Sequence, residues 1–100
     1  MEKVLIFGVG DLGGHILEFL ARGDYPLQVV VADINEEKAR LTCNNAVIGA
    51  AHHGKHPDFQ TMKADLFDVP GTTQLIKKVQ PNAVINCTVM HTWHLIRRLP

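Results

Sequence analysis

The chain has 100 residues, which is enough for one small domain with a modest core. Its residues are 46% hydrophobic and 20% charged with a formal net charge of zero, so charge gives no case for nucleic acid or an anionic membrane as partner. Cys43 and Cys87 lack the spacing of a disulfide framework, and neither a secretory signal nor a bilayer-long apolar run is visible. These features predict reduced thiols and a cytoplasmic protein.

The first half of the chain predicts two buried strands, each followed by a helix. Val4–Phe7 and Leu27–Ala32 are continuous apolar runs, which suit parallel strands covered on both faces. A helix is expected from about Glu36 to Ile48 or a little beyond, with Asn35 as its N-cap. Asp11–Arg22 is expected to be an amphipathic helix whose apolar face lies on the sheet and comprises Leu12, Ile16, Leu17, Phe19 and Leu20.

The second half repeats this alternation after a polar loop at His52–Asp58. Phe59–Leu66 alternates between apolar and polar residues, which suits a strand near a sheet edge. A helix is expected at about Thr72–Val79, and a fourth buried strand at Ala83–Thr88. The resulting β-α-β-α-β-α-β order predicts an α/β fold, a Rossmann-type parallel sheet with strand order 3-2-1-4. This is about half of a doubly wound dinucleotide fold. Because His91–Pro100 resembles the opening of another helix, we expect residues 1–100 to be the N-terminal domain of a longer protein.

The glycines between the first strand and the first helix fit G-x-G-x-x-G. Gly8 allows a sharp turn, Gly10 allows a pyrophosphate to approach the backbone, and Gly13 allows the helix to pack closely on the sheet. The N–H groups of the first helical turn, which contains Asp11 and Leu12, would face the phosphates. The charge of Asp11 argues against tight phosphate binding, unless it points to solvent as an acid at a helix start.

An acidic residue at the end of the second strand completes this pattern. Asp33 follows Gly13 by twenty positions, where a carboxylate accepts hydrogen bonds from the ribose hydroxyls and repels a 2′-phosphate. Ile34 and Asn35 follow it, with no arginine, which favours NAD over NADP as the cofactor. The alternative is a glycine turn that binds nothing, with Asp33 only capping the second helix.

The ends of the third and fourth strands should lie at the same sheet edge, where open α/β sheets bind ligands. Leu66 and Ile34 can flank the adenine, and Asp65 can accept a hydrogen bond from its amino group. Cys87 and Thr88 are candidates for the nicotinamide side. Ordinary loop packing is the alternative for each of these side chains.

The histidines carry no prediction of a metal site. His52, His53 and His56, even with Cys43, lack paired ligand spacing, and a solvated loop is the favoured interpretation. His91 and His94 follow the fourth strand, where a general acid or base is one interpretation and packing at a helix start the favoured one. No catalytic residue is assigned.

Three stretches together resemble the N-terminal nucleotide-binding domain of saccharopine dehydrogenase-like oxidoreductases: Val4–Gly14, Val29–Asp33 and Gln80–Thr88. Nucleotide-sugar reductases of the extended short-chain type rank lower, because their G-x-x-G-x-x-G pattern needs a glycine where Asp11 stands. The resemblance implies NAD(P)-dependent hydride transfer at a C–N or C–O bond. It transfers the cofactor role to Gly8, Gly10, Gly13 and Asp33.

The resemblance also implies that a small-molecule substrate binds through a domain beyond this chain. Two other readings stay open: a regulatory module that senses NAD or another adenine nucleotide without catalysis, and an assembly fragment with an exposed strand edge. Nucleic acid and membrane partners are not expected, and assembly into a homo-oligomer is left open.

Overall fold

The computed structural model describes residues 2–23 and 25–88. They form seven elements in the predicted order: β1 (Glu2–Phe7), α1 (Asp11–Arg22), β2 (Leu27–Asp33), α2 (Glu36–Ala51), β3 (Asp58–Lys63), α3 (Val69–Val79) and β4 (Ala83–Asn86).

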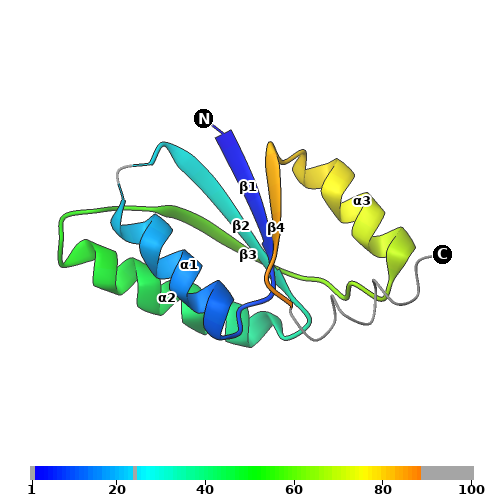
Figure 1. Cartoon of the computed structure of the whole chain (residues 1–100), viewed down its shortest axis with the longest axis horizontal. Helices are drawn as coiled ribbons and strands as arrows, with labels where there is room; N and C mark the ends of the chain where they lie inside the picture. Colours follow the sequence, from blue (N-terminus) through cyan, green and yellow to red (C-terminus); the bar gives the residue numbers. More distant parts are fainter. Residues whose placement is uncertain (1, 24, 89–100) are drawn as a thin grey trace.

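All strand pairs are parallel, and the strand order is β3-β2-β1-β4. Helices α1 and α2 cover one face of the sheet and α3 covers the other (Figure 1). This confirms the predicted Rossmann-type α/β topology. Because Phe7 pairs with Ala32 on one side and with Asn86 on the other, β1, β2 and β4 end at one edge. The turns that follow these strands therefore meet.

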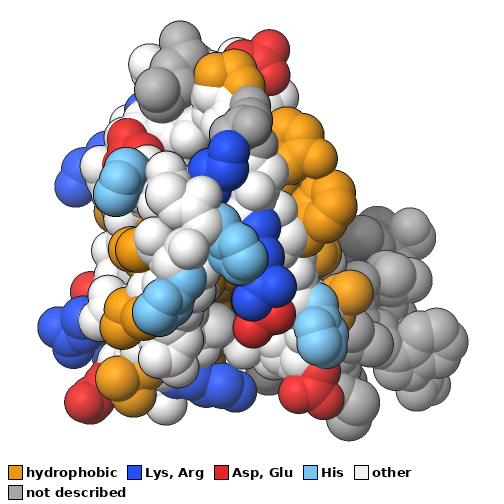
Figure 2. Space-filling view, turned by 90° about the vertical axis from the view of Figure 1, so that its left-hand side faces the viewer, with side chains coloured by type: hydrophobic (Ala, Val, Ile, Leu, Met, Phe, Trp, Pro, Cys, Tyr) orange, Lys and Arg blue, Asp and Glu red, His pale blue; other side chains and the backbone are white. Residues whose placement is uncertain are grey.

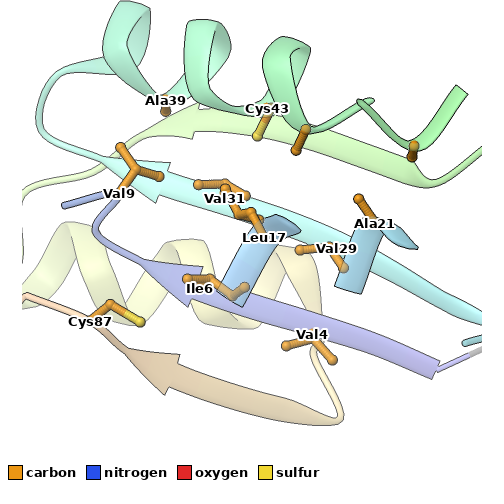
Figure 3. Close-up of a cluster of buried hydrophobic side chains, with 12 residues drawn as sticks. Val4, Ile6, Val9, Leu17, Ala21, Val29, Val31, Ala39, Cys43 and Cys87 are labelled. Atoms are coloured by element: carbon orange, nitrogen blue, oxygen red, sulfur yellow. The ribbon is translucent and has the colours of Figure 1, made fainter. Parts of the chain in front are cut away.

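Successive residues of the central strands point to opposite faces, and both faces are buried. On one face Ile6, Val29 and Val31 pack with Leu17 of α1 and with Cys43 of α2 (Figure 3). The opposite face packs against Val79 of α3 and is formed by Leu5, Phe7, Val30 and Ala32. The continuous apolar runs of β1 and β2 follow from this two-sided burial.

The predicted inner face of α1 is wrong at two positions. Leu12 and Phe19 are 52% and 64% exposed. The buried residues of this helix are Gly13, Leu17 and Ala21, which recur every fourth residue. Small residues at both ends of this stripe let the helix axis come close to the sheet, and the larger side chains flank it.

Two element boundaries in the second half also differ from the prediction. Strand β3 stops at Lys63, three residues early. Helix α3 starts at Val69, three residues early, because the Asp68 carboxylate accepts a hydrogen bond from the Gly71 N–H (3.1 Å) and Pro70 fits the first helical turn.

The fourth strand was predicted to be buried, and this is wrong for most of it. β4 ends at Asn86, and Val84 is 48% exposed. In the described part of the chain β4 pairs with β1 alone, so its outer edge and part of its surface lack cover. The stretch His91–Pro100 lies outside the described residues. No helix among the described residues has both the length and the apolarity needed to cross a membrane.

Candidate functional site

A cavity of about 660 Å³ opens at the carboxyl edge of the sheet, where the loops after all four strands meet. Eleven of the twelve predicted site residues line it: Gly8, Gly10, Asp11, Leu12, Asp33, Ile34, Asn35, Asp65, Leu66, Cys87 and Thr88. Gly13 does not line the cavity. The other lining residues were not predicted from the sequence: Phe7, Val9, Ala32, Lys38, Ala64 and Phe67. Lys38 lies three residues after the N-cap of α2, a position that the prediction could have considered.

Gly8 stands where β1, β2 and β4 come together. Its N–H donates to the Ala32 carbonyl oxygen (2.9 Å), and its φ of +91° lies in a region that L side chains rarely adopt. A Cβ at this position would lie 2.5 Å from Cγ2 of Thr88 and 3.2 Å from the backbone of Cys87. Only glycine fits here.

Gly13 and Gly10 differ in the space available beside the α-carbon. A Cβ on Gly13 would collide with the carbonyl oxygen of Gly8, so this glycine sets the distance between α1 and the turn. A Cβ on Gly10 would have no heavy atom within 4 Å, because the space beside it belongs to the cavity. The backbone of Gly10, at the N-terminus of α1, is therefore open to a ligand.

The Asp33 carboxylate joins the end of β2 to the glycine turn. One carboxylate oxygen accepts a hydrogen bond from the Val9 N–H (2.9 Å), and the other accepts one from the Asn35 N–H (2.8 Å). The cap of α2 is the Asn35 side chain, which accepts from the Lys38 N–H (3.1 Å), as predicted. Asp33 therefore does more than precede a helix, because it fixes the shape of the turn that carries Gly10.

The remaining acids of the cavity are placed near its rim. Asp11 is exposed at the first position of α1, where its charge is solvated and complements the helix dipole. Asp65 is exposed, and its carboxylate accepts a hydrogen bond from the Phe67 N–H (2.9 Å). Each oxygen of a carboxylate has two lone pairs, so Asp33 and Asp65 retain acceptor capacity toward a ligand.

The residues after β4 form the opposite wall. The Cys87 N–H donates to the Phe7 carbonyl oxygen (2.7 Å), and the Asn86 side chain accepts hydrogen bonds from the Thr88 N–H and hydroxyl. Burial raises the pKa of the Cys87 thiol. A raised pKa keeps the thiol protonated near neutrality, which argues against a thiolate nucleophile at this wall.

Residues 4–96 match the family described as saccharopine dehydrogenase NADP binding domain. The chain belongs to this family. Comparison with individually curated proteins gives no match.

Membership of this family identifies the chain as a dinucleotide-binding domain of the kind found in a dehydrogenase. The open backbone at Gly10 and the carboxylate at the end of β2 fit such a ligand. The family description names NADP, so the expected preference for NAD finds no support in it.

The histidines of this family member do not form a metal site within the described residues. No group of three or more His, Cys, Asp or Glu side chains in residues 2–23 and 25–88 is arranged to hold a metal ion. His52, His53 and His56 are exposed. Histidine side chains are spread over the face of the molecule that Figure 2 shows. His91 and His94 lie outside the described residues.

Proposed function

We propose that residues 1–100 form the NAD(P)-binding domain of an oxidoreductase, as the N-terminal part of a longer protein. The observation that carries the proposal is the open backbone at Gly10, in a cavity that Asp33 also lines. In such an enzyme the bound nicotinamide supplies or accepts the hydride, while the protein binds and orients it. The catalytic acid or base and the substrate site would belong to a domain beyond this chain.

The pyrophosphate would lie against Gly10 and the first turn of α1. The Gly14 N–H makes the first intrahelical bond, to the Gly10 carbonyl oxygen (2.8 Å). The N–H groups before it have no partner further back in the helix, and a helix N-terminus favours an anion. The exposed Asp11 carboxylate weakens this attraction but can turn toward solvent.

The adenosine would lie over the end of β2. The Asp33 oxygens, already directed by two backbone N–H groups, would accept hydrogen bonds from the ribose hydroxyls. Ile34 and Leu66 offer apolar contact to the adenine, and Asp65 can accept from its amino group. The charge of Asp33 disfavours a 2′-phosphate, so we place NAD ahead of NADP. Cys87 and Thr88 would then wall the nicotinamide side.

The test is calorimetric titration of the chain with NADH, NADPH, ATP and ADP-ribose. We expect NADH to bind more tightly than ATP, because only the dinucleotide also reaches the wall after β4. If no dinucleotide binds, the proposal fails. If ATP binds more tightly than NADH, a nucleotide-sensing module replaces the oxidoreductase as the better reading.

A matched pair of variants locates the phosphate. Gly10→Ala places a methyl group in the open space of the cavity and should lower NADH affinity about tenfold or more, equivalent to at least about 1.4 kcal/mol. Gly14→Ala adds the same group four residues on, outside the cavity and with only an ordinary contact to Thr42, and should leave affinity unchanged. Equal affinities of the two variants would refute the placement at Gly10.

A further inference from the structure

The described residues after β4, Cys87 and Thr88, both line the cavity and use their backbone N–H groups within the protein. The Cys87 N–H donates to the Phe7 carbonyl oxygen (2.7 Å), and the Thr88 N–H donates to Oδ1 of Asn86 (2.9 Å). The Thr88 hydroxyl donates to the same Oδ1 atom. Three donors of this wall therefore already have acceptors in the protein.

The direction of the Thr88 hydroxyl bond follows from the backbone bond beside it. A backbone N–H can only donate, so the Asn86 atom that it meets is the amide oxygen and not the amide nitrogen. The hydroxyl lies against that same oxygen, which has no proton to give, so the hydroxyl is the donor. Thr88 Oγ1 therefore offers a ligand lone pairs, and the ligand has to supply the proton.

The Thr88 side chain is also held in one orientation. Its Cγ2 methyl group lies where a side chain on Gly8 would stand, and its Oγ1 is bonded to Asn86. Because both branches on Cβ have a defined place, rotation about χ1 is restricted in the absence of a ligand. An acceptor that is already oriented loses little side-chain entropy when a ligand binds.

Other side chains around β4 offer the cavity no equivalent group. The Cys87 side chain is 5% exposed and packs in the buried cluster beneath α1 and α2 (Figure 3). The Asn86 amide nitrogen carries donors, but Asn86 does not line the cavity. Among the described residues, Thr88 therefore contributes the polar side chain of this wall.

The place of Thr88 in the sheet assigns it to one end of the dinucleotide. Asp33, after β2, is placed to meet the adenosine ribose, and Gly10 is placed to meet the pyrophosphate. Thr88 follows β4, which lies on the other side of β1 from β2. A dinucleotide lies across the point where the strand order changes direction, so its nicotinamide nucleoside would reach the wall after β4.

We propose that Thr88 Oγ1 accepts a hydrogen bond from the nicotinamide nucleoside, and that Asn86 is the positioning residue that makes Thr88 an obligate acceptor. This inference rests on the proposed function, because it assigns one contact of the same cofactor. The donors on that nucleoside are the ribose hydroxyls and the carboxamide N–H groups. An anionic group, which has no proton to donate, is disfavoured at this wall.

The experiment is calorimetric titration of the full chain and its variants with NADH, ADP-ribose and ADP. All three ligands contain the adenosine and the pyrophosphate, and ADP lacks everything beyond them. Thr88→Val keeps the shape of the side chain and the backbone N–H bond but removes the acceptor oxygen. It should lower NADH affinity about fivefold, the scale of one hydrogen bond between uncharged groups, and leave ADP affinity within about twofold. Thr88→Ala is the second variant if Thr88→Val unfolds.

ADP-ribose identifies the donor, because it keeps the terminal ribose hydroxyls and lacks the carboxamide. If Thr88→Val lowers the affinities for ADP-ribose and NADH equally, the donor is a ribose hydroxyl. If Thr88→Val lowers the affinity for NADH alone, the donor is the carboxamide. Both results support the contact with Thr88.

Further variants separate the hydrogen bond from the shape of the turn. Thr88→Ser keeps the hydroxyl, and Asn86→Asp keeps an oxygen that accepts both bonds, so each should retain NADH affinity within about twofold. Asn86→Ala frees the hydroxyl proton and should lower NADH affinity about threefold without changing ADP affinity. Thr73→Val is the matched control, because the Thr73 hydroxyl donates to the Val69 carbonyl oxygen (2.9 Å) outside the cavity. It should change the affinity for none of the ligands.

Two results would overturn the inference and leave the proposed function standing. One is wild-type affinity for NADH and ADP-ribose in both Thr88→Val and Thr88→Ala. The other is an equal loss of ADP and NADH affinity in Thr88→Val, which would mean that Thr88 acts through the shape of the glycine turn. A wild type that binds no dinucleotide refutes the proposed function itself, and the inference with it.

Discussion

Strands β2 and β4 both flank β1 and both end at the cavity, yet their surroundings differ. Val29 and Val31 of β2 are almost completely buried, whereas Val84 of β4 is 48% exposed. β2 has a strand on each side and helices on both faces, whereas β4 pairs with β1 alone in the described part of the chain.

The two walls of the site are therefore stabilised to different degrees by packing and hydrogen bonds. The wall after β2 is held by core packing and by the Asp33 hydrogen bonds. The wall after β4 depends on its register with β1 and on two hydrogen bonds between Lys3 and Asn82. The Lys3 N–H donates to Oδ1 of Asn82 (2.8 Å), and the Asn82 N–H donates to the Lys3 carbonyl oxygen (2.7 Å). Substitutions around β2 should therefore cost stability, while those on β4 should be tolerated by the fold.

The largest difference in stability is expected between a truncation in the core and a truncation on the edge strand β4. Leu17→Ala removes a fully buried side chain above β1 and β2 and should lower the free energy of unfolding by about 2–5 kcal/mol. Val84→Ala, on the exposed part of β4, should lower it by less than about 1 kcal/mol. Urea denaturation followed by circular dichroism measures both, and equal losses would contradict the division.

The reactivity of the two cysteines reports on the same difference between the packed core beside β2 and the wall after β4. Burial raises the pKa of the Cys43 thiol from 9.0 to about 11, so its thiolate fraction at pH 8 should be about a hundredfold below that of an unperturbed thiol. In Cys87→Ser, the rate with a disulfide reagent should keep rising with pH until about pH 11. Levelling near pH 9 would mean that Cys43 is not shielded.

Cys87 lines the cavity, so in Cys43→Ser the remaining thiol should react faster than Cys43 does and be slowed by NADH. NADH should leave the Cys43 rate unchanged. Equal protection of both thiols would indicate a general stabilisation and not a ligand at the wall after β4.

A smaller effect is expected from Asp33→Asn. An asparagine has one acceptor oxygen, so one of the Val9 and Asn35 N–H groups would face its amide nitrogen and lose its partner. The free energy of unfolding should fall by about 1–3 kcal/mol, and NADH affinity should fall more than NADPH affinity. Asn86→Ala, which removes the corresponding turn bond after β4, should change stability by about 0.5 kcal/mol or less. A larger loss for Asn86→Ala would reverse the comparison.

The last comparison concerns the caps of two helices, α2 and α3. Asn35→Ala should cost about 1 kcal/mol, and Asp68→Ala about the same, because each removes the acceptor of one N–H at a helix start. Only Asn35→Ala should also lower NADH affinity, since it loosens the start of α2 beside the Asp33 carboxylate. The two thermal midpoints and the two cofactor titrations provide the check.

The sequence predicted the order of the elements and the strand order, because the apolar runs, glycines and prolines are local signals. It also predicted eleven of the residues that line the cavity, since the parallel topology brings strand ends together. It placed Leu17 correctly on the inner side of α1 and misplaced Leu12 and Phe19 there. The inner positions Gly13 and Ala21 carry no strong apolar signal. The exposure of β4 depends on neighbours and not on its own composition. Lys38 and Phe67 reach the cavity by a helical turn and a loop, which periodicity does not reveal.

The hydrogen bond between Val9 and Asp33 joins residues 24 positions apart, whereas the one between Lys3 and Asn82 spans 79. Closing the shorter loop costs less chain entropy. The phosphate turn and its carboxylate therefore belong to the first βαβ unit of the chain. All residues of this unit have been synthesised before α3 and β4, whereas the wall after β4 needs contacts between residues near both ends of the described chain.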